Sequence, residues 1–129
     1  MVLDSSAIVA ILFDEPDAET YRVAVFEDET RLVSAATLLE ASLVIERRKG
    51  EPGGRELDLF VSRAAIEIVP VDADQFAAAR RAWRKFGRGR HAAGLNHGNL
   101  FAYALARVTG QPLLFKGDAF ARTDVARVI

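Results

Sequence analysis

The sequence opens with Met1-Val2-Leu3-Asp4-Ser5-Ser6, which predicts a short buried strand that ends on a carboxylate and passes directly into a helix. Strands that are apolar on both faces are typical of parallel sheets covered by helices on both sides, and ligands of such sheets bind at the carboxyl ends of the strands. We therefore expect Asp4 at that edge. A carboxylate in this place can cap the helix, hold a divalent cation, accept a phosphoryl group or activate water.

The composition limits the class of protein. The chain has 129 residues, of which 50% are hydrophobic and 27% charged, so we expect one globular domain over residues 1–129. The absence of cysteine excludes a disulfide framework, a thiolate nucleophile and cysteine-ligated zinc, and two histidines are too few for a histidine-rich metal site. No apolar run approaches the roughly 18 residues that span a membrane. We expect a protein of the reducing cytoplasm without a membrane partner.

Apolar and β-branched segments of strand length alternate with segments of helical composition along the whole chain. This alternation predicts a three-layer α/β/α sandwich around a central, mainly parallel sheet. Right-handed crossovers then bring the chain ends after Leu3, Val33 and Phe115 to one edge of the sheet. The expected strands are 1–3, 31–33, 66–71 and 112–115, with a short edge strand at 125–129. The expected helices are 7–12, capped by Ser5 or Ser6, then 17–28, 35–49, 55–65, 73–86, 97–109 and a short one at 119–122, with a turn at 51–54.

Glu40 is the second acid expected at this edge. The side chains three and four residues away along its helix are all uncharged, so it lies on an otherwise apolar face. An isolated carboxylate in such surroundings is costly and needs a partner. It pairs with a distant arginine, stays protonated, or shares a cation with Asp4.

Two further polar residues are candidates for the same site. Asp118 follows a strand directly, as Asp4 does, and serves either as a ligand or as the cap of the helix at 119–122. Asn99 falls in the first turn of its helix, where a capping role explains it as well as a site role does. Carboxylate and amide oxygens without histidine or cysteine suit Mg²⁺ or Mn²⁺. Such an ion supports phosphodiester hydrolysis by lowering the pKa of the attacking water and stabilising the leaving oxygen.

Four segments carry a resemblance to a known family. They are Val2-Leu3-Asp4-Ser5-Ser6-Ala7, Ser34 to Ala41 (SAATLLEA), Gly89 to Ala106, which ends in GLNHGNLFAYALA, and Pro112 to Asp118 (PLLFKGD). In this order and spacing they resemble the PIN-domain ribonucleases of the VapC toxin family over essentially the whole chain. The resemblance implies a PIN-like fold and an endoribonuclease toxin of a type II toxin-antitoxin pair, dependent on Mg²⁺ or Mn²⁺. It also implies structured RNA such as tRNA or rRNA as substrate, a homodimer, and silencing by a cognate VapB-type antitoxin.

The resemblance also assigns site residues. Asp4 and Glu40 match the family's first two metal-binding acids, Asp118 matches the later acid that completes the site, and Ser6 matches the hydroxyl that supports the first acid. Asn99 stands where the family has an aspartate. The exchange removes one negative charge from a site for a dication, and we expect losses of at least about 10–100-fold in metal affinity or activity. The sequence thus predicts an impaired nuclease or, alternatively, a non-catalytic module that binds RNA or the antitoxin.

Charge is distributed unevenly along the chain. The segment 80–91 contains six lysines and arginines and no acid, whereas residues 14–29 contain seven acids and one arginine. The basic segment predicts either contacts with an RNA backbone or a solvated helix face. Lys116, beside the proposed site, either holds a phosphate or pairs with a carboxylate. The predicted RNA contacts are Arg84, Lys85, Arg88, Arg90 and Lys116, while Trp83 and Phe86 are expected in the core in preference to stacking on bases.

Two other classes that act on phosphoryl groups fit the sequence less well. A receiver-like phosphotransfer domain requires a proline after its late lysine, and Lys116 is followed by Gly117. A phosphatase of the haloacid-dehalogenase type requires a second aspartate two residues after the first, and that position is Ser6.

Overall fold

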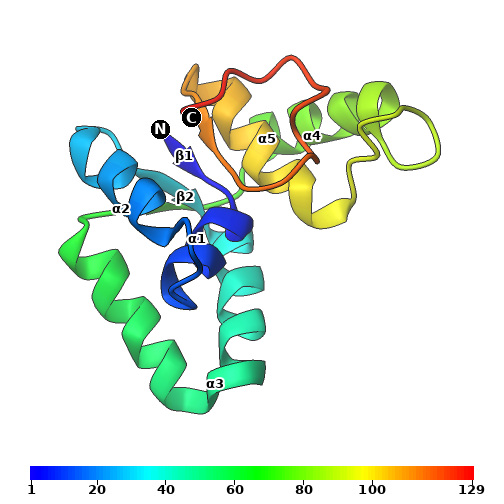
Figure 1. Cartoon of the computed structure of the whole chain (residues 1–129). Coiled ribbons are helices and arrows are strands. Elements are labelled where there is room, and N and C mark those ends of the chain that lie inside the picture. Colours follow the sequence, from blue (N-terminus) through cyan, green and yellow to red (C-terminus); the bar gives the residue numbers. More distant parts are fainter.

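The computed structural model describes residues 1–129 and contains a four-stranded, all-parallel sheet in the order β3-β2-β1-β4 (Figure 1). Because β1 has β2 on one side and β4 on the other, the sheet changes winding direction at β1, and the carboxyl ends of β1 and β4 form the place where ligands of open α/β sheets bind. A single parallel bridge between Leu113 and Arg127 adds the C-terminal tail to the free edge of β4, within the edge strand predicted at 125–129. The strands are β1 (Val2–Leu3), β2 (Leu32–Ser34), β3 (Glu67–Val69) and β4 (Leu113–Leu114).

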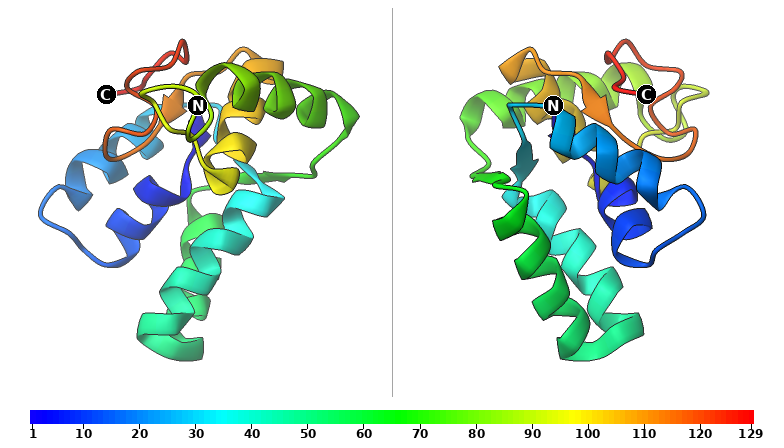
Figure 2. Two further views of the ribbon diagram at one scale, coloured as in Figure 1. Left: turned by 90° about the vertical axis from the view of Figure 1, so that its right-hand side faces the viewer. Right: turned by 60° about the vertical axis from the view of Figure 1, so that its left-hand side comes forward.

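Five helices cover the two faces of this sheet (Figure 2). Alternate residues of a strand face opposite sides, so Leu3 packs against α1, α2 and α3 in one core, whereas Val2 packs against α4 and α5 in a second core. This arrangement confirms the predicted three-layer α/β/α sandwich. None of the helices combines the length and the apolar character needed to cross a membrane. The helices are α1 (Ser5–Leu12), α2 (Ala18–Glu27), α3 (Ala35–Arg63), α4 (Ala73–Phe86) and α5 (His97–Thr109).

The predicted turn at 51–54 is wrong, because helix α3 continues through it after a kink at Gly50. The backbone of Gly50 has φ 69° and ψ −166°, a combination open essentially to glycine alone, and it reverses the chain within one residue. Pro52 then lies in the first turn of the second half of α3, where its missing N–H costs nothing. The two halves meet at the kink and spread apart toward the sheet, so that α3 projects from it as a V-shaped helical hairpin (Figures 1 and 2).

The predicted short helix at 119–122 is also wrong. The segment after β4 forms single turns, in which Ala121 N–H donates to the Asp118 carbonyl at 3.2 Å and Thr123 N–H donates to the Phe120 carbonyl at 3.1 Å. Phe120 is buried and packs against Phe115, with 5.2 Å between ring centroids. One buried ring therefore fixes this segment over the end of β4 without continuous helical hydrogen bonding.

Candidate metal site at the carboxyl edge of the sheet

Asp4 lies where the sequence predicts, directly after β1. It is the N-cap of α1, in place of the expected Ser5 or Ser6, and its side chain is 2% exposed. Its Oδ2 accepts from the Ser6 N–H at 3.0 Å and from the Ser6 hydroxyl at 2.6 Å. The Ser6 hydroxyl oxygen in turn accepts from the Lys116 N–H at 2.9 Å. Ser6 therefore holds Asp4 in one orientation and ties it to the end of β4.

The other oxygen of Asp4, Oδ1, is buried and has no hydrogen-bond partner. Burial raises the pKa of Asp4, the hydrogen bonds from Ser6 lower it, and the nearby negative charge of Glu40 raises it again. A buried carboxylate oxygen without a donor costs free energy, and a bound cation removes that cost. The residues present at this position therefore fit a hard divalent cation on Oδ1.

Glu40 reaches the same place from α3. Its Oε1 accepts from the Ser5 hydroxyl at 2.6 Å, so neighbouring serines hold the two acids. Its Oε2 lies against Gly98 at the start of α5, where a Cβ atom would come within 2.0 Å of the oxygen. The partner of this half-buried carboxylate is therefore a serine. The distant arginine that the sequence allows as a partner does not contact it.

Asn99 is half-buried in the first turn of α5, where it forms a capping box with Asn96. The Asn96 side chain accepts from the Asn99 N–H at 2.9 Å, and Asn99 Oδ1 accepts from the Asn96 N–H at 3.1 Å. The amide oxygen that would serve as a ligand is therefore engaged in holding the helix end. Asn99 therefore has the helix-capping role that its position in the first turn predicts.

The structure does not gather the remaining predicted site residues around Asp4 and Glu40. Asp118 is exposed and its side chain makes no hydrogen bond. No group of three His, Cys, Asp or Glu side chains lies close enough together to hold a metal ion. Lys116 pairs with carboxylates, the second of the two roles that the sequence allows. Its ammonium group bonds to Glu15 and, at 2.9 Å, to Asp17. These contacts with Asp17 and Glu15 raise the pKa of Lys116.

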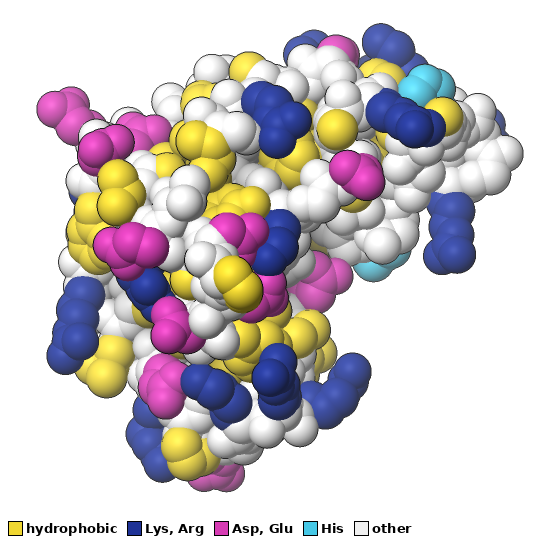
Figure 3. All heavy atoms as spheres, viewed as in Figure 1, with side chains coloured by type: hydrophobic (Ala, Val, Ile, Leu, Met, Phe, Trp, Pro, Cys, Tyr) yellow, Lys and Arg dark blue, Asp and Glu magenta, His cyan; other side chains and the backbone are white.

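The basic segment forms the end of α4 and the loop after it, and Arg84, Lys85, Arg88 and Arg90 are all exposed. Figure 3 shows Lys and Arg side chains gathered over this region and acidic side chains gathered over α2, on the opposite side of the view. Phe86 is buried as expected, but Trp83 is 40% exposed, so its predicted place in the core is wrong. The guanidinium of Arg90 covers the Trp83 ring at 4.1 Å from its centroid.

Sequence reasoning missed the site roles of Ser5 and Gly98. The sequence assigns Ser5 only a helix-capping role, although a hydroxyl beside a strand-end acid is a signal for the site. For Gly98 the signal was a glycine in the first turn of a predicted helix, where its low helix propensity needs a reason. In both cases the contact is with Glu40, which belongs to a different helix, and its existence depends on how α1, α3 and α5 pack.

The structure is therefore a parallel α/β sandwich with two serine-held carboxylates, Asp4 and Glu40, at its switch point. The sequence pattern of the PIN domain matches residues 1–126. The chain is 62% identical over 128 residues to the Ribonuclease VapC of Mycolicibacterium smegmatis, and the match covers 99% of each chain. The chain therefore belongs to the PIN domain family and, within it, to the VapC ribonucleases.

Solved structures of two VapC proteins share the fold. VapBC2 from Rickettsia felis bound to a DNA fragment from their promoter gives a TM-score of 0.78 at 18% identity, covering 98% of this chain and 94% of that one. VapC20 of Mycobacterium tuberculosis, a Sarcin-Ricin loop cleaving toxin, gives a TM-score of 0.76 at 16% identity, covering 97% and 95%.

Proposed function

We propose that this chain is a divalent-metal-dependent endoribonuclease toxin of a type II toxin-antitoxin pair, which acts in the cytoplasm on structured RNA and is impaired by Asn99. The observation that carries the proposal is the buried Oδ1 of Asp4, which has no hydrogen-bond partner and lies beside Glu40. Membership of the VapC ribonucleases supports RNA as the substrate class. VapC20, named for cleavage of the Sarcin-Ricin loop, supports structured RNA as the kind of target. Ribosomal RNA and tRNA are the two candidate targets.

In this proposal Asp4 and Glu40 hold Mg²⁺ or Mn²⁺. When bound, such an ion lowers the pKa of an attacking water and stabilises the leaving oxygen of the phosphodiester. Ser6 holds Oδ2 of Asp4 and so leaves Oδ1 free for an ion, and Ser5 holds the carboxylate of Glu40. Both side chains are therefore oriented without an ion. Asp118, which the structure leaves exposed and outside the Asp4–Glu40 pair, is the third ligand that we propose, since its side chain has no competing hydrogen bond.

Asn99 weakens this site in two ways. Its neutral amide supplies one negative charge fewer than an aspartate, so the site attracts a dication less strongly. Its oxygen is also the acceptor of the capping box with Asn96, so coordination would cost the end of α5 a hydrogen bond. The second observation favours the alternative function, a PIN module that binds RNA or antitoxin without cleaving, because Asn99 has a structural role without any metal.

Protein partners are the second part of the proposal. A VapB-type antitoxin is proposed with support from VapBC2, the Rickettsia felis neighbour. A second copy of the chain is proposed as a further partner. Leu39 and Leu43 support a protein contact, since they are 60% and 57% exposed one turn apart on α3, beside Glu40. Exposed leucines at this spacing form a stripe that a partner helix can cover.

The test is cleavage of a pool of tRNA and rRNA by this chain and by Asn99→Asp, each with Mg²⁺, Mn²⁺ or EDTA. We expect metal-dependent cleavage that is weak or absent in the parent chain and at least about 10–100-fold stronger in Asn99→Asp. Adding Asp4→Ala to Asn99→Asp should abolish it. Absence of discrete cleavage by both the parent chain and Asn99→Asp would overturn the nuclease and favour the binding module.

A further inference from the structure

A surface groove of about 360 Å³ lies beside the candidate metal site, between α4 and the start of α5. We call it the aromatic groove. Three of its five lining residues are hydrophobic and none is acidic. Its lining residues are Phe76, Arg80, Trp83, His97 and Leu100.

The two large aromatic rings of the groove are exposed, and an arginine guanidinium group lies over each of them. Phe76 is 55% exposed and Trp83 is 40% exposed. Arg80 lies over the Phe76 ring at 4.9 Å from its centroid, and Arg90 lies over the Trp83 ring at 4.1 Å. Flat apolar faces with cations above them match a ligand that has a flat ring and a negative charge next to it.

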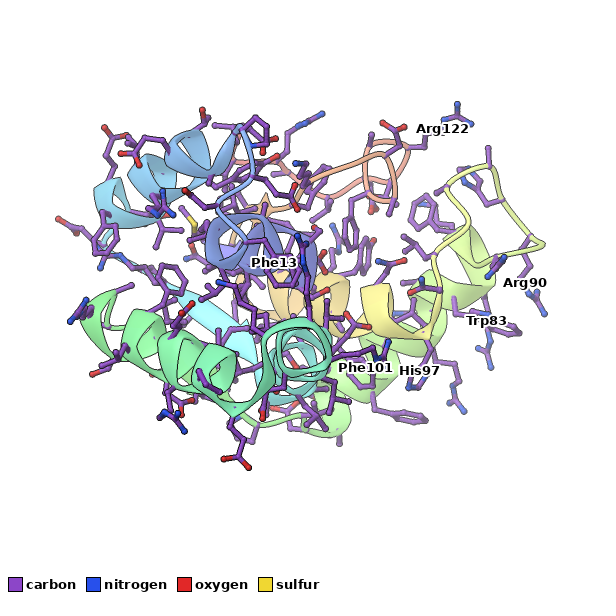
Figure 4. All side chains as sticks on the ribbon, turned by 60° about the horizontal axis from the view of Figure 1, so that its bottom comes forward. Phe13, Trp83, Arg90, His97, Phe101 and Arg122 are labelled. Carbon is purple, nitrogen blue, oxygen red and sulfur yellow. The ribbon has the colours of Figure 1, made fainter.

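The groove lies next to Glu40 at the start of α5. His97 lines the groove, and the next residue, Gly98, touches the Oε2 of Glu40. Figure 4 shows His97 beside Phe101 at the start of α5, with Trp83 and Arg90 further along the same side of the molecule. A chain of nucleotides that occupies the groove therefore continues toward the place where a phosphodiester would meet the acids.

We propose that the aromatic groove binds an unpaired nucleotide of the RNA substrate, with its base stacked on Trp83 and Phe76 and its flanking phosphates held by Arg80 and Arg90. This inference rests on the proposed function for its choice of RNA as ligand. Stacking on aromatic side chains tolerates any base, while arginines neutralise the backbone. The groove thus positions a splayed-out base and leaves the acids to act on a neighbouring bond.

A second copy of the chain is the competing occupant, and the charges argue against it. A symmetric dimer would place this surface against its own copy. The segment 80–91 has six lysines and arginines without an acid, so such a contact would set like charges against each other. A phosphate backbone meets the same cations with opposite charge.

The test uses the only tryptophan of the chain, Trp83, as its own reporter. A short single-stranded RNA with 2′-O-methyl groups, which cannot be cleaved through the 2′-oxygen, is titrated in EDTA while tryptophan emission and the anisotropy of a labelled copy are followed. We expect saturable quenching of Trp83. An oligomer of the same length with abasic sugars should bind more weakly and leave the emission unchanged, because it lacks the stacking partner.

Substitutions measure the contribution of the rings. We expect Trp83→Ala and Phe76→Ala each to weaken binding by roughly 5- to 150-fold, the effect of losing one stacked base. Trp83→Phe keeps a ring and should lose much less, which separates stacking from misfolding. The matched control is Phe26→Ala, because Phe26 is 50% exposed and has Arg31 at 5.3 Å from its ring but lies among acids. It should bind RNA like the parent chain.

Three outcomes would overturn the proposal: equal binding of abasic and base-containing RNA, equal losses in Trp83→Ala and Phe26→Ala, or Trp83 emission that responds to protein concentration and not to RNA. The last outcome, with a matching change in sedimentation, would assign the groove to a second copy. Since the assay needs no metal and no cleavage, it is independent of the nuclease test. If Asn99→Asp does not cleave RNA but its Trp83 emission is quenched normally by RNA, only the proposed nuclease activity is contradicted.

Discussion

The carboxylate of Glu40 lies so close to Gly98 that a methyl group at position 98 would meet its Oε2 at 2.0 Å. Gly98 therefore lets α5 approach α3 closely enough for Glu40 to remain beside Asp4. The obstructed atom is the end of a flexible side chain, so an added methyl group would move the carboxylate while the helices stay in place.

We expect Gly98→Ala to fold normally and to lose metal affinity. Alanine is a better helix former than glycine by about 1 kcal/mol, which offsets part of the cost of moving Glu40. In the Asn99→Asp background, displacement of this ligand should weaken Mn²⁺ binding, measured by calorimetry, by about 10-fold or more. Gly54→Ala is the matched control, since its Cβ would meet the Glu46 carboxylate at 2.9 Å in α3. Equal Mn²⁺ affinity in both variants would contradict the role of Gly98.

Ser6→Ala tests how Asp4 is held. The substitution removes the hydroxyl that donates to Asp4 at 2.6 Å and accepts from the Lys116 N–H at 2.9 Å. Both groups lose a hydrogen bond, so we expect the free energy of unfolding in urea to fall by about 1–3 kcal/mol. Ser6→Thr keeps the hydroxyl and should retain most of the stability. If Thr and Ala are equally destabilising, the loss comes from packing and not from the hydrogen bonds.

Asp4→Asn should stabilise the fold, and the gain should depend on pH. Burial raises the pKa of Asp4 above its usual 3.8, so the native state binds a proton more tightly than the unfolded state does. Between pH about 4 and the raised pKa, the free energy of unfolding therefore falls as pH rises. The asparagine keeps an acceptor for Ser6 but carries no charge. We expect a difference of roughly 0.5–2 kcal/mol at pH 8 that disappears near pH 3.5, measured by urea unfolding in EDTA. A difference that is the same at both pH values would exclude a buried charge as its cause.

The sequence alone predicts the parts of the site that depend on local pattern. Asp4 after an apolar strand, Glu40 on an uncharged helical face and Asn99 in a first helical turn follow from periodicity and capping rules. The helix end at Gly50 follows from the rule that glycine and proline mark breaks, and the non-helical backbone of Gly50 confirms it. The sequence alone does not predict that the second helical half begins directly after it, at 51–54.

What the sequence alone does not predict depends on how distant elements pack. The contact of Gly98 with Glu40 needs the separation of α5 and α3, and the orientation of Asp118 needs the turns that follow Phe115. Trp83 was expected in the core because large aromatic residues usually contribute to cores. Its place on the surface depends on which face of α4 meets α5, and the hydrophobic residues of α4 do not decide that.

Lys116→Gln separates structural cations from cations that bind RNA. The Lys116 ammonium group already bonds to Glu15 and Asp17, so it has no free charge for a phosphate. We expect the variant to keep the slope of log affinity for single-stranded RNA against log salt concentration. Arg90→Gln should reduce that slope by about 0.7, the value for one phosphate contact on a single strand. The measurement is anisotropy of a labelled oligonucleotide at several salt concentrations in EDTA. If the salt slope of Lys116→Gln is reduced as much as that of Arg90→Gln, Lys116 contacts the RNA and the prediction is wrong.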